Sequence, residues 1–167
     1  MPTEKNITLE LKRHDFFMQE ALKEAKLAFD KNEVPIGCVI VYKDEIYSRG
    51  HNKRIQNSSP ISHAEIEAIQ DACKKRNDWR LEHMTLYVSS EPCLMCAGAI
   101  IHSRISKVVY GCREPKMGAV ESVYKAFDIE NLHHKVEYLG GILEKECSNI
   151  LTEFFKKIRQ SRKETAL

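Results

Sequence analysis

Segments with the apolar spacing of a helix alternate along this chain with short apolar runs typical of strands. This alternation constrains the fold more than any other feature of the sequence. Apolar residues recur three and four positions apart over residues 14–32, which is the spacing of an amphipathic helix. Two short strand-like runs follow at 37–42 and 46–50, and the turn-like Lys43-Asp44-Glu45 separates them. The first third of the chain therefore predicts a helix followed by a β-hairpin.

The same alternation continues to the end of the chain. The pattern predicts further helices at residues 63–75, 94–102 and 142–162, a short helix at 123–127, and strands at 85–89, 107–111 and 135–139. Ser62 is the expected N-cap of the 63–75 helix, with Glu65 three residues further on. Helices that alternate with strands favour an α/β fold in which helices cover one sheet. The strand order does not follow from this pattern.

Length and composition favour one globular domain spanning residues 1–167, because a chain of this size can bury one substantial core. Charged residues make up 30% of the chain and hydrophobic residues 43%, which is unlike a disordered or fibrous protein. The net charge of +2 is too small to indicate nucleic-acid binding by bulk electrostatics. We find neither an apolar stretch of membrane-spanning length nor a secretory signal in residues 1–13, so we expect a cytoplasmic protein without a membrane partner.

The six cysteines are expected to serve as metal ligands or buried thiols, because cytoplasmic chains of this size rarely need disulfides. Cys93 and Cys96 stand three residues apart across the expected start of the 94–102 helix, so both can reach one ion. A helix N-terminus also stabilises the thiolate, which is the form that binds metal. The pair alone is compatible with zinc, with a thioredoxin-like redox pair or with half of a four-ligand structural zinc site.

His63 and Glu65, at the start of another predicted helix, favour a catalytic zinc site. His63 with two thiolates supplies three protein ligands, which leaves one tetrahedral position for water, as catalytic zinc requires. Zinc lets such a water lose its proton near neutral pH. A carboxylate beside the metal can take that proton and deliver it to the substrate, and Glu65 is placed for this role.

The remaining cysteines and histidines carry weaker signals. The other cysteines are expected to be small buried hydrophobic residues: Cys38, Cys73, Cys112 and Cys147. The other histidines have no partner at metal-ligand spacing and are expected to be structural or to face substrate: His14, His51, His83, His102, His133 and His134.

His-x-Glu followed by Pro-Cys-x-x-Cys resembles the signature of the zinc deaminases. The resemblance extends to the bacterial tRNA-specific adenosine deaminases through residues 33–37, 50–52, 63–66, 85–88 and 91–105, and it runs from about Phe16 to Arg159. It implies conversion of adenosine to inosine at the wobble position of an arginine tRNA anticodon. It also implies a cytidine-deaminase-like three-layer α/β/α sandwich with a mixed five-stranded sheet, and a homodimer that binds tRNA with both subunits and one Zn²⁺ in each.

By position, the resemblance also assigns residues to substrate binding. It places Asn52 against the nucleoside, the backbone of Ala64 at the base, and three residues in the pocket wall: Val34, Pro35 and Pro92. Glu114 and Lys116 belong to a segment, residues 112–118, that resembles a substrate-contacting loop. The chain departs from the family pattern at Glu114, where aspartate is usual, at His133, where asparagine is usual, and at Ser62, where alanine is common.

The C-terminal helix predicted at 142–162 carries a basic cluster: Lys156, Lys157, Arg159, Arg162 and Lys163. Charge alone favours a solvated helix face, whereas the resemblance favours contact with tRNA phosphates. Three alternative functions are a deaminase of free guanine or cytosine, a catalytically silent zinc-containing RNA-binding subunit, and a thiol redox protein. Residues 98–105 resemble the adenosine type and favour tRNA, whereas Glu65 argues against a silent subunit and, with His63, against a redox protein.

Overall fold

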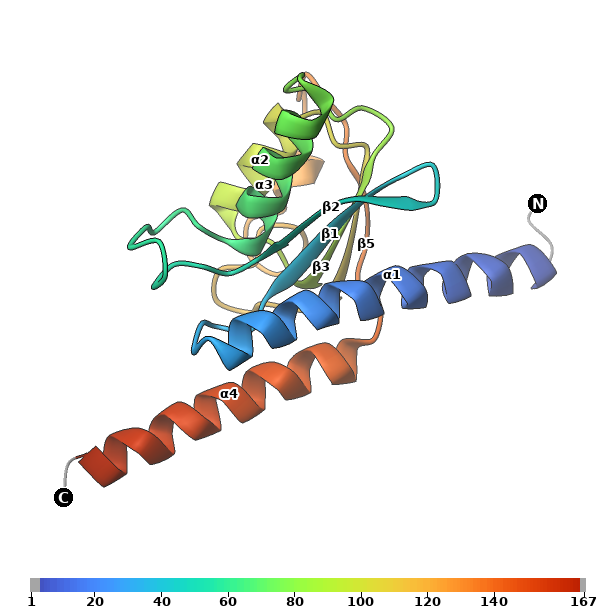
Figure 1. Cartoon of the computed structure of the whole chain (residues 1–167). Helices are drawn as coiled ribbons and strands as arrows, with labels where there is room; N and C mark the ends of the chain where they lie inside the picture. The colour runs from blue at the N-terminus through green and yellow to red at the C-terminus, as the bar shows by residue number, and fades with distance from the viewer. Residues whose placement is uncertain (1–3, 166–167) are drawn as a thin grey trace.

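Five strands form one mixed sheet in the computed structural model of the chain, which describes residues 4–165 (Figure 1). The strands are β1 (Gly37–Tyr42), β2 (Glu45–His51), β3 (Thr85–Ser90), β4 (Lys107–Cys112) and β5 (Glu137–Leu139). Their order across the sheet is β2-β1-β3-β4-β5. β1 pairs antiparallel with β2 and β3, whereas β4 pairs parallel with β3 and β5. The predicted mixed five-stranded sheet is confirmed.

Helices cover both faces of this sheet (Figure 1). α1 (Glu4–Asp30) and α4 (Glu144–Thr165) lie on one face, and α2 (Ala64–Arg76) and α3 (Leu94–His102) lie on the other. A short 3₁₀ helix, η1 (Ala126–Asp128), packs beside α3. The arrangement is the predicted three-layer α/β/α sandwich.

The pleat of the strands divides the buried side chains between two cores. On β1, Cys38 and Ile40 belong to the cluster under α2 and α3, whereas Val39 and Val41 belong to the cluster under α1. Side chains two apart on a strand share a face, so a strand covered on both sides must be apolar at almost every position. This is why β1 is a continuous apolar run in the sequence.

Several helix boundaries differ from the prediction for identifiable reasons. α1 begins at Glu4 rather than at residue 14. Residues 6–13 are exposed, and their large apolar residues, Ile7, Leu9 and Leu11, alternate along the chain instead of following the spacing of an amphipathic helix. α4 covers 144–165 rather than 142–162, since Leu143 has a left-handed φ of 51°. Lys125 has a φ of 48°, so the helix predicted at 123–127 is instead η1.

The remaining differences are small. β5 begins at Glu137 rather than at residue 135. The N-cap of α2 is His63 rather than Ser62, whose hydroxyl oxygen instead accepts a hydrogen bond from Asn57 Nδ2 at 3.1 Å. The predicted domain of 1–167 begins and ends at residues outside the described range. Within residues 4–165, none of the helices combines the length and apolar composition that crossing a bilayer requires.

Candidate active site

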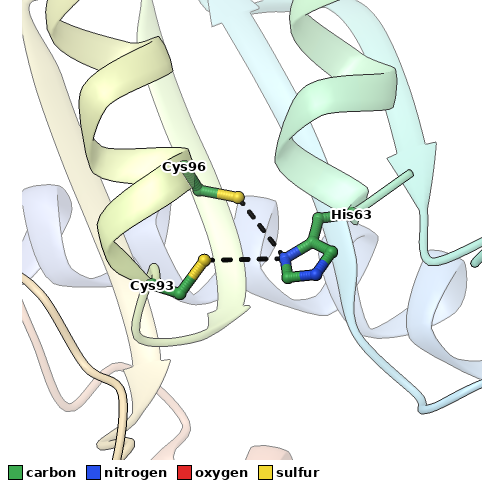
Figure 2. Close-up of side chains that lie close together, drawn as sticks. All are labelled: His63, Cys93 and Cys96. Carbon is green, nitrogen blue, oxygen red and sulfur yellow. Dashed lines mark hydrogen bonds between the residues drawn. The ribbon is translucent and has the colours of Figure 1, made fainter. Parts of the chain in front are cut away.

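Two helix N-termini meet at one end of the sheet, and the three predicted metal ligands lie there. His63 is the N-cap of α2, Cys93 is the N-cap of α3, and Cys96 lies in the first turn of α3. Figure 2 shows the Nδ1 edge of the His63 ring directed at both sulfur atoms. The fold thus brings together the three side chains that the sequence spacing assigned to one metal ion.

The two nitrogen–sulfur distances among these side chains match those of a tetrahedral zinc site. His63 Nδ1 lies 3.6 Å from Cys93 Sγ and 3.6 Å from Cys96 Sγ, and all three ligand atoms lie within 4.8 Å of one another. With Zn–N and Zn–S bonds of about 2.05 and 2.3 Å, tetrahedral angles place the nitrogen about 3.6 Å from each sulfur. Between residues 4 and 165, this is the one group of three or more such side chains close enough to hold an ion.

The two thiols polarise each other. A hydrogen bond from Cys96, together with the neighbouring His63, lowers the pKa of Cys93 to about 4. The same hydrogen bond and burial raise the pKa of Cys96. The interaction with Cys93 also raises the pKa of His63. Cys93 is therefore a thiolate at neutral pH, the form in which cysteine ligates metal.

Glu65 lies in the first turn of α2, two residues after His63, and is only 3% exposed. Burial raises the pKa of its carboxyl group. A carboxyl group shifted in this direction holds and releases a proton closer to neutral pH than an exposed one. The side chain lines a cavity of about 80 Å³ with six other residues: Val34, Ile36, Asn52, Arg54, His63 and Ala64.

Asn52 is held in place by its neighbours in the cavity wall. Its Nδ2 donates to the carbonyl oxygen of Val34 at 3.2 Å, and its Oδ1 accepts the backbone N–H of Arg54 at 3.3 Å. Both polar ends of the amide are thus oriented by backbone groups. Of the predicted substrate-binding residues, Asn52, Val34 and Ala64 line this cavity together.

The other predicted substrate-binding residues do not line this cavity. Pro35 and Pro92 are buried. Glu114 and Lys116 lie on the loop after β4, and the Glu114 carboxylate accepts the backbone N–H of Lys116 at 2.9 Å. An antiparallel bridge between Cys93 and Gly118 ties this loop to the metal-ligand segment.

A second, larger cavity of about 540 Å³ adjoins the first and shares Val34, Asn52 and Arg54 with it. Residues of α4 complete its wall, among them Phe154, Phe155, Ile158 and Arg162. The sequence reasoning identified Arg162 but missed Ile36, Arg54 and the two phenylalanines. In the sequence, two adjacent aromatic residues stand beside the basic run of α4, and this pattern could have indicated the α4 wall. Arg54 could have been found because it stands only two positions after Asn52.

The remaining cysteines are largely as expected. All six cysteines are free, and Cys38, Cys112 and Cys147 are buried. Cys73 is half-buried rather than buried, and its thiol donates to the carbonyl oxygen of Trp79 at 3.6 Å.

Three of the remaining histidines have structural partners. His14 Nδ1 lies 2.9 Å from Tyr87 Oη, and His51 Nδ1 lies 3.1 Å from Glu24 Oε2. His134 Nε2 lies 2.7 Å from the carbonyl oxygen of Ile105.

The α/β/α sandwich, the His-Cys-Cys group and the adjacent buried glutamate define a deaminase with a cytidine-deaminase-like fold. A family model described as MafB19-like deaminase matches residues 12–159. The tRNA-specific adenosine deaminase of Bacillus subtilis (strain 168) is 46% identical over 149 residues, which cover 89% of this chain and 92% of that protein. The chain therefore belongs to the family of tRNA-specific adenosine deaminases.

One solved structure agrees with this assignment. A structure from studies of A-to-I editing by tRNA:A34 deaminases at the wobble position of transfer RNA has a TM-score of 0.79 and 40% identity, covering 81% of this chain and 99% of that one. A guanine deaminase from Nitrosomonas europaea has a TM-score of 0.69 at 21% identity, covering 84% and 83% of the two chains. The second likeness shows the shared fold alone.

Proposed function

We propose that this protein converts adenosine to inosine at the wobble position of an arginine tRNA anticodon, as one zinc-dependent domain of residues 1–167. One observation carries the proposal: a buried glutamate, Glu65, lines a cavity beside a His63, Cys93 and Cys96 group of zinc-binding geometry. Family membership then selects adenosine in tRNA as the substrate. The reaction would add water at C6 of the base and release ammonia.

The donor set supports zinc as the metal. One imidazole and two thiolates suit Zn²⁺ and occupy three of its four tetrahedral positions. When bound there, zinc would supply the Lewis acidity that makes water a nucleophile near neutral pH. His63 and Cys93, as N-caps, would fix the ligand atoms relative to both helices.

Glu65 would move the protons. It would accept a proton from the attacking water and pass it to N1 of the adenine ring. It would then take the second proton from the C6 hydroxyl formed by the addition and deliver it to the departing amine, so that the C6–N bond breaks and ammonia leaves. Its place two residues from His63 puts the carboxylate beside the ligand group without making it a ligand. Burial keeps bulk water from competing for the proton.

The small cavity would hold the target base. Asn52 would contact the nucleoside, the Ala64 backbone would contact the base, and Val34 would form the wall, with Pro35 and Pro92 supporting it. Such a pocket accepts only a base that has left its stack, and an unpaired anticodon loop offers one at low cost. Glu114 and Lys116 would contact nucleotides beside the target.

The larger cavity would hold neighbouring nucleotides of the loop. Phe155 is 44% exposed, and Arg54 and Arg162 flank the same cavity, which combines an aromatic surface with positive charge. Proteins that bind unpaired RNA commonly use this combination. The basic cluster of α4 would add phosphate contacts, although Lys157 also donates to Asn32 Oδ1 at 3.0 Å.

We further propose a homodimer with one Zn²⁺ in each subunit, in which both subunits bind tRNA. A tRNA substrate would place the protein in the cytoplasm.

A substrate panel tests the proposal. The protein is incubated with an arginine tRNA that carries an ACG anticodon, with the same tRNA carrying GCG, and with free adenosine, guanine and cytosine. Inosine at the first anticodon position of the ACG tRNA, with no ammonia from the free bases, is the expected result. The GCG tRNA controls for deamination elsewhere in the molecule.

Two results would overturn it. Ammonia from guanine or cytosine without inosine in the tRNA would indicate a free-base deaminase. Tight tRNA binding by a zinc-loaded protein that deaminates nothing would indicate a silent RNA-binding subunit.

A further inference from the structure

One buried carboxylate accepts hydrogen bonds from several residues of the loop that follows β4. Glu91 stands directly after β3 and is 3% exposed. Its Oε1 accepts the backbone N–H groups of Val120 at 3.1 Å, Glu121 at 2.8 Å and Ser122 at 2.9 Å. Its Oε2 accepts the backbone N–H of Glu114 at 3.0 Å and the hydroxyl of Ser122. Five donors from residues 114–122 therefore converge on one side chain.

This convergence requires a negative charge. An ionised carboxylate has two acceptor oxygens and no donor, so all five N–H and O–H groups can point at it, with three of them sharing Oε1. A glutamine would instead direct an NH₂ group at donors.

The same side chain stands next to a proposed metal ligand. Only Pro92 separates Glu91 from Cys93, and Cys93 bridges to Gly118 in the loop. Ala119 also donates its backbone N–H to the carbonyl oxygen of Pro92 at 2.8 Å. A β-carbon at Gly118 would lie 2.4 Å from Glu91 Oε2, so the loop needs glycine to approach this closely.

The tip of the loop is accessible. Lys116 is exposed and Met117 is 53% exposed, whereas Gly118 and Val120 are buried. The hydrogen bonds to Glu91 thus hold the buried part of the loop next to Cys93, while the tip of the loop stays exposed.

We propose that Glu91 is a positioning residue for substrate, which holds the 113–118 loop beside the metal ligands so that its exposed tip contacts the RNA next to the target nucleotide. The inference rests on the proposed function for the identity of the ligand, an unpaired RNA segment. It does not assign Glu91 a role in moving protons or in binding metal.

The test compares Glu91→Gln with the zinc-loaded wild type. Amide hydrogen exchange should show lost protection at Glu114, Glu121 and Ser122, while metal analysis still finds one zinc per chain. In single-turnover assays with an anticodon stem-loop, the half-saturating RNA concentration should rise about tenfold or more. The rate at saturating RNA should stay within about threefold of wild type, because Glu65 and the metal ligands are intact.

Glu24→Gln is the matched control, because Glu24 is also a buried carboxylate, 7% exposed, but pairs with His51 and Arg49 on the α1 side of the sheet. It should leave loop protection and RNA half-saturation unchanged. If Glu91→Gln does not fold, Gly118→Ala perturbs the same contact from the loop side and should give the same kinetic pattern.

Three results would overturn the proposal: unchanged exchange at the loop, lost protection with unchanged RNA half-saturation, or loss of zinc together with the rate at saturation. If the wild type forms no inosine, the proposed function fails, but hydrogen exchange still tests whether Glu91 anchors the loop.

Discussion

Gly50→Ala should displace α2 and with it the candidate metal site. Gly50 lies on β2 directly beneath the first turns of α2. A β-carbon added there would lie 2.3 Å from the carbonyl oxygen of Ala64 and 2.6 Å from the backbone nitrogen of Ala68. Both obstacles are helix backbone, so neither can rotate away as a side chain could.

The geometry sets the size of the effect. An ordinary contact needs 3.4 Å, so α2 would have to retreat by about 1 Å. Overpacking of this kind costs about 1–3 kcal/mol, and rigid backbone favours the upper end. For a domain of this size, 3 kcal/mol lowers Tm by roughly 6–12 °C. A shift of about 1 Å also exceeds the roughly 0.2 Å tolerance of metal–ligand bonds, so zinc affinity should fall by about tenfold or more.

Thermal unfolding followed by circular dichroism, with a zinc-competition titration, measures both effects. Gly98→Ala is the matched control, because a β-carbon at Gly98 in α3 would meet nothing within 4 Å. It should stabilise the protein by about 0.5–1 kcal/mol through helix propensity and leave zinc affinity unchanged. If Gly50→Ala keeps Tm within about 2 °C of wild type and binds zinc normally, the close approach of β2 and α2 is wrong.

Three further predictions concern single side chains. Glu65→Gln should keep one zinc per chain but lower the deamination rate by about 10²–10⁴-fold. Metal analysis and inosine quantification on the same sample measure both quantities, and near-normal turnover would contradict the proton-transfer role. Cys93→Ala should lose zinc and the stability that zinc confers, and retention of stoichiometric zinc would remove Cys93 from the ligand set. Stability should fall as pH is lowered from about 7 to 5, because burial lowers the pKa of His14 and the unfolded chain then binds a proton that the folded chain does not. His14→Gln should flatten this part of the profile in urea unfolding, and an unchanged slope would exclude His14 as its source.

The sequence predicts best those helices and strands that have an apolar face packed in the core. β1 and α3 have the predicted bounds of 37–42 and 94–102, because apolar side chains mark every buried position. The exposed first turns of α1 bury nothing and so leave no periodic signal. The left-handed residues Lys125 and Leu143 end or delay helices through backbone conformation, which side-chain type alone does not reveal.

The grouping of His63, Cys93 and Cys96 could be predicted because each of these residues stands at the start of a predicted helix. The α4 wall of the larger cavity could not, since it depends on how α4 packs against loops far away in the chain. Glu91 was likewise missed as an anchor. A charged residue between a buried strand and a proposed ligand must find partners, but the sequence does not show that the loop after β4 supplies them.

The positions of His63 and Cys93 give the site a cost in stability that a bound metal would offset. His63 and Cys93 are N-caps, yet neither side chain makes a capping hydrogen bond. An N-cap of Ser, Thr, Asp or Asn is worth about 1 kcal/mol, so the two helices together give up roughly 2 kcal/mol. A metal that binds the folded chain alone restores stability by mass action. Cys93→Ala should therefore lower Tm mainly in the presence of zinc, because without zinc it removes no cap.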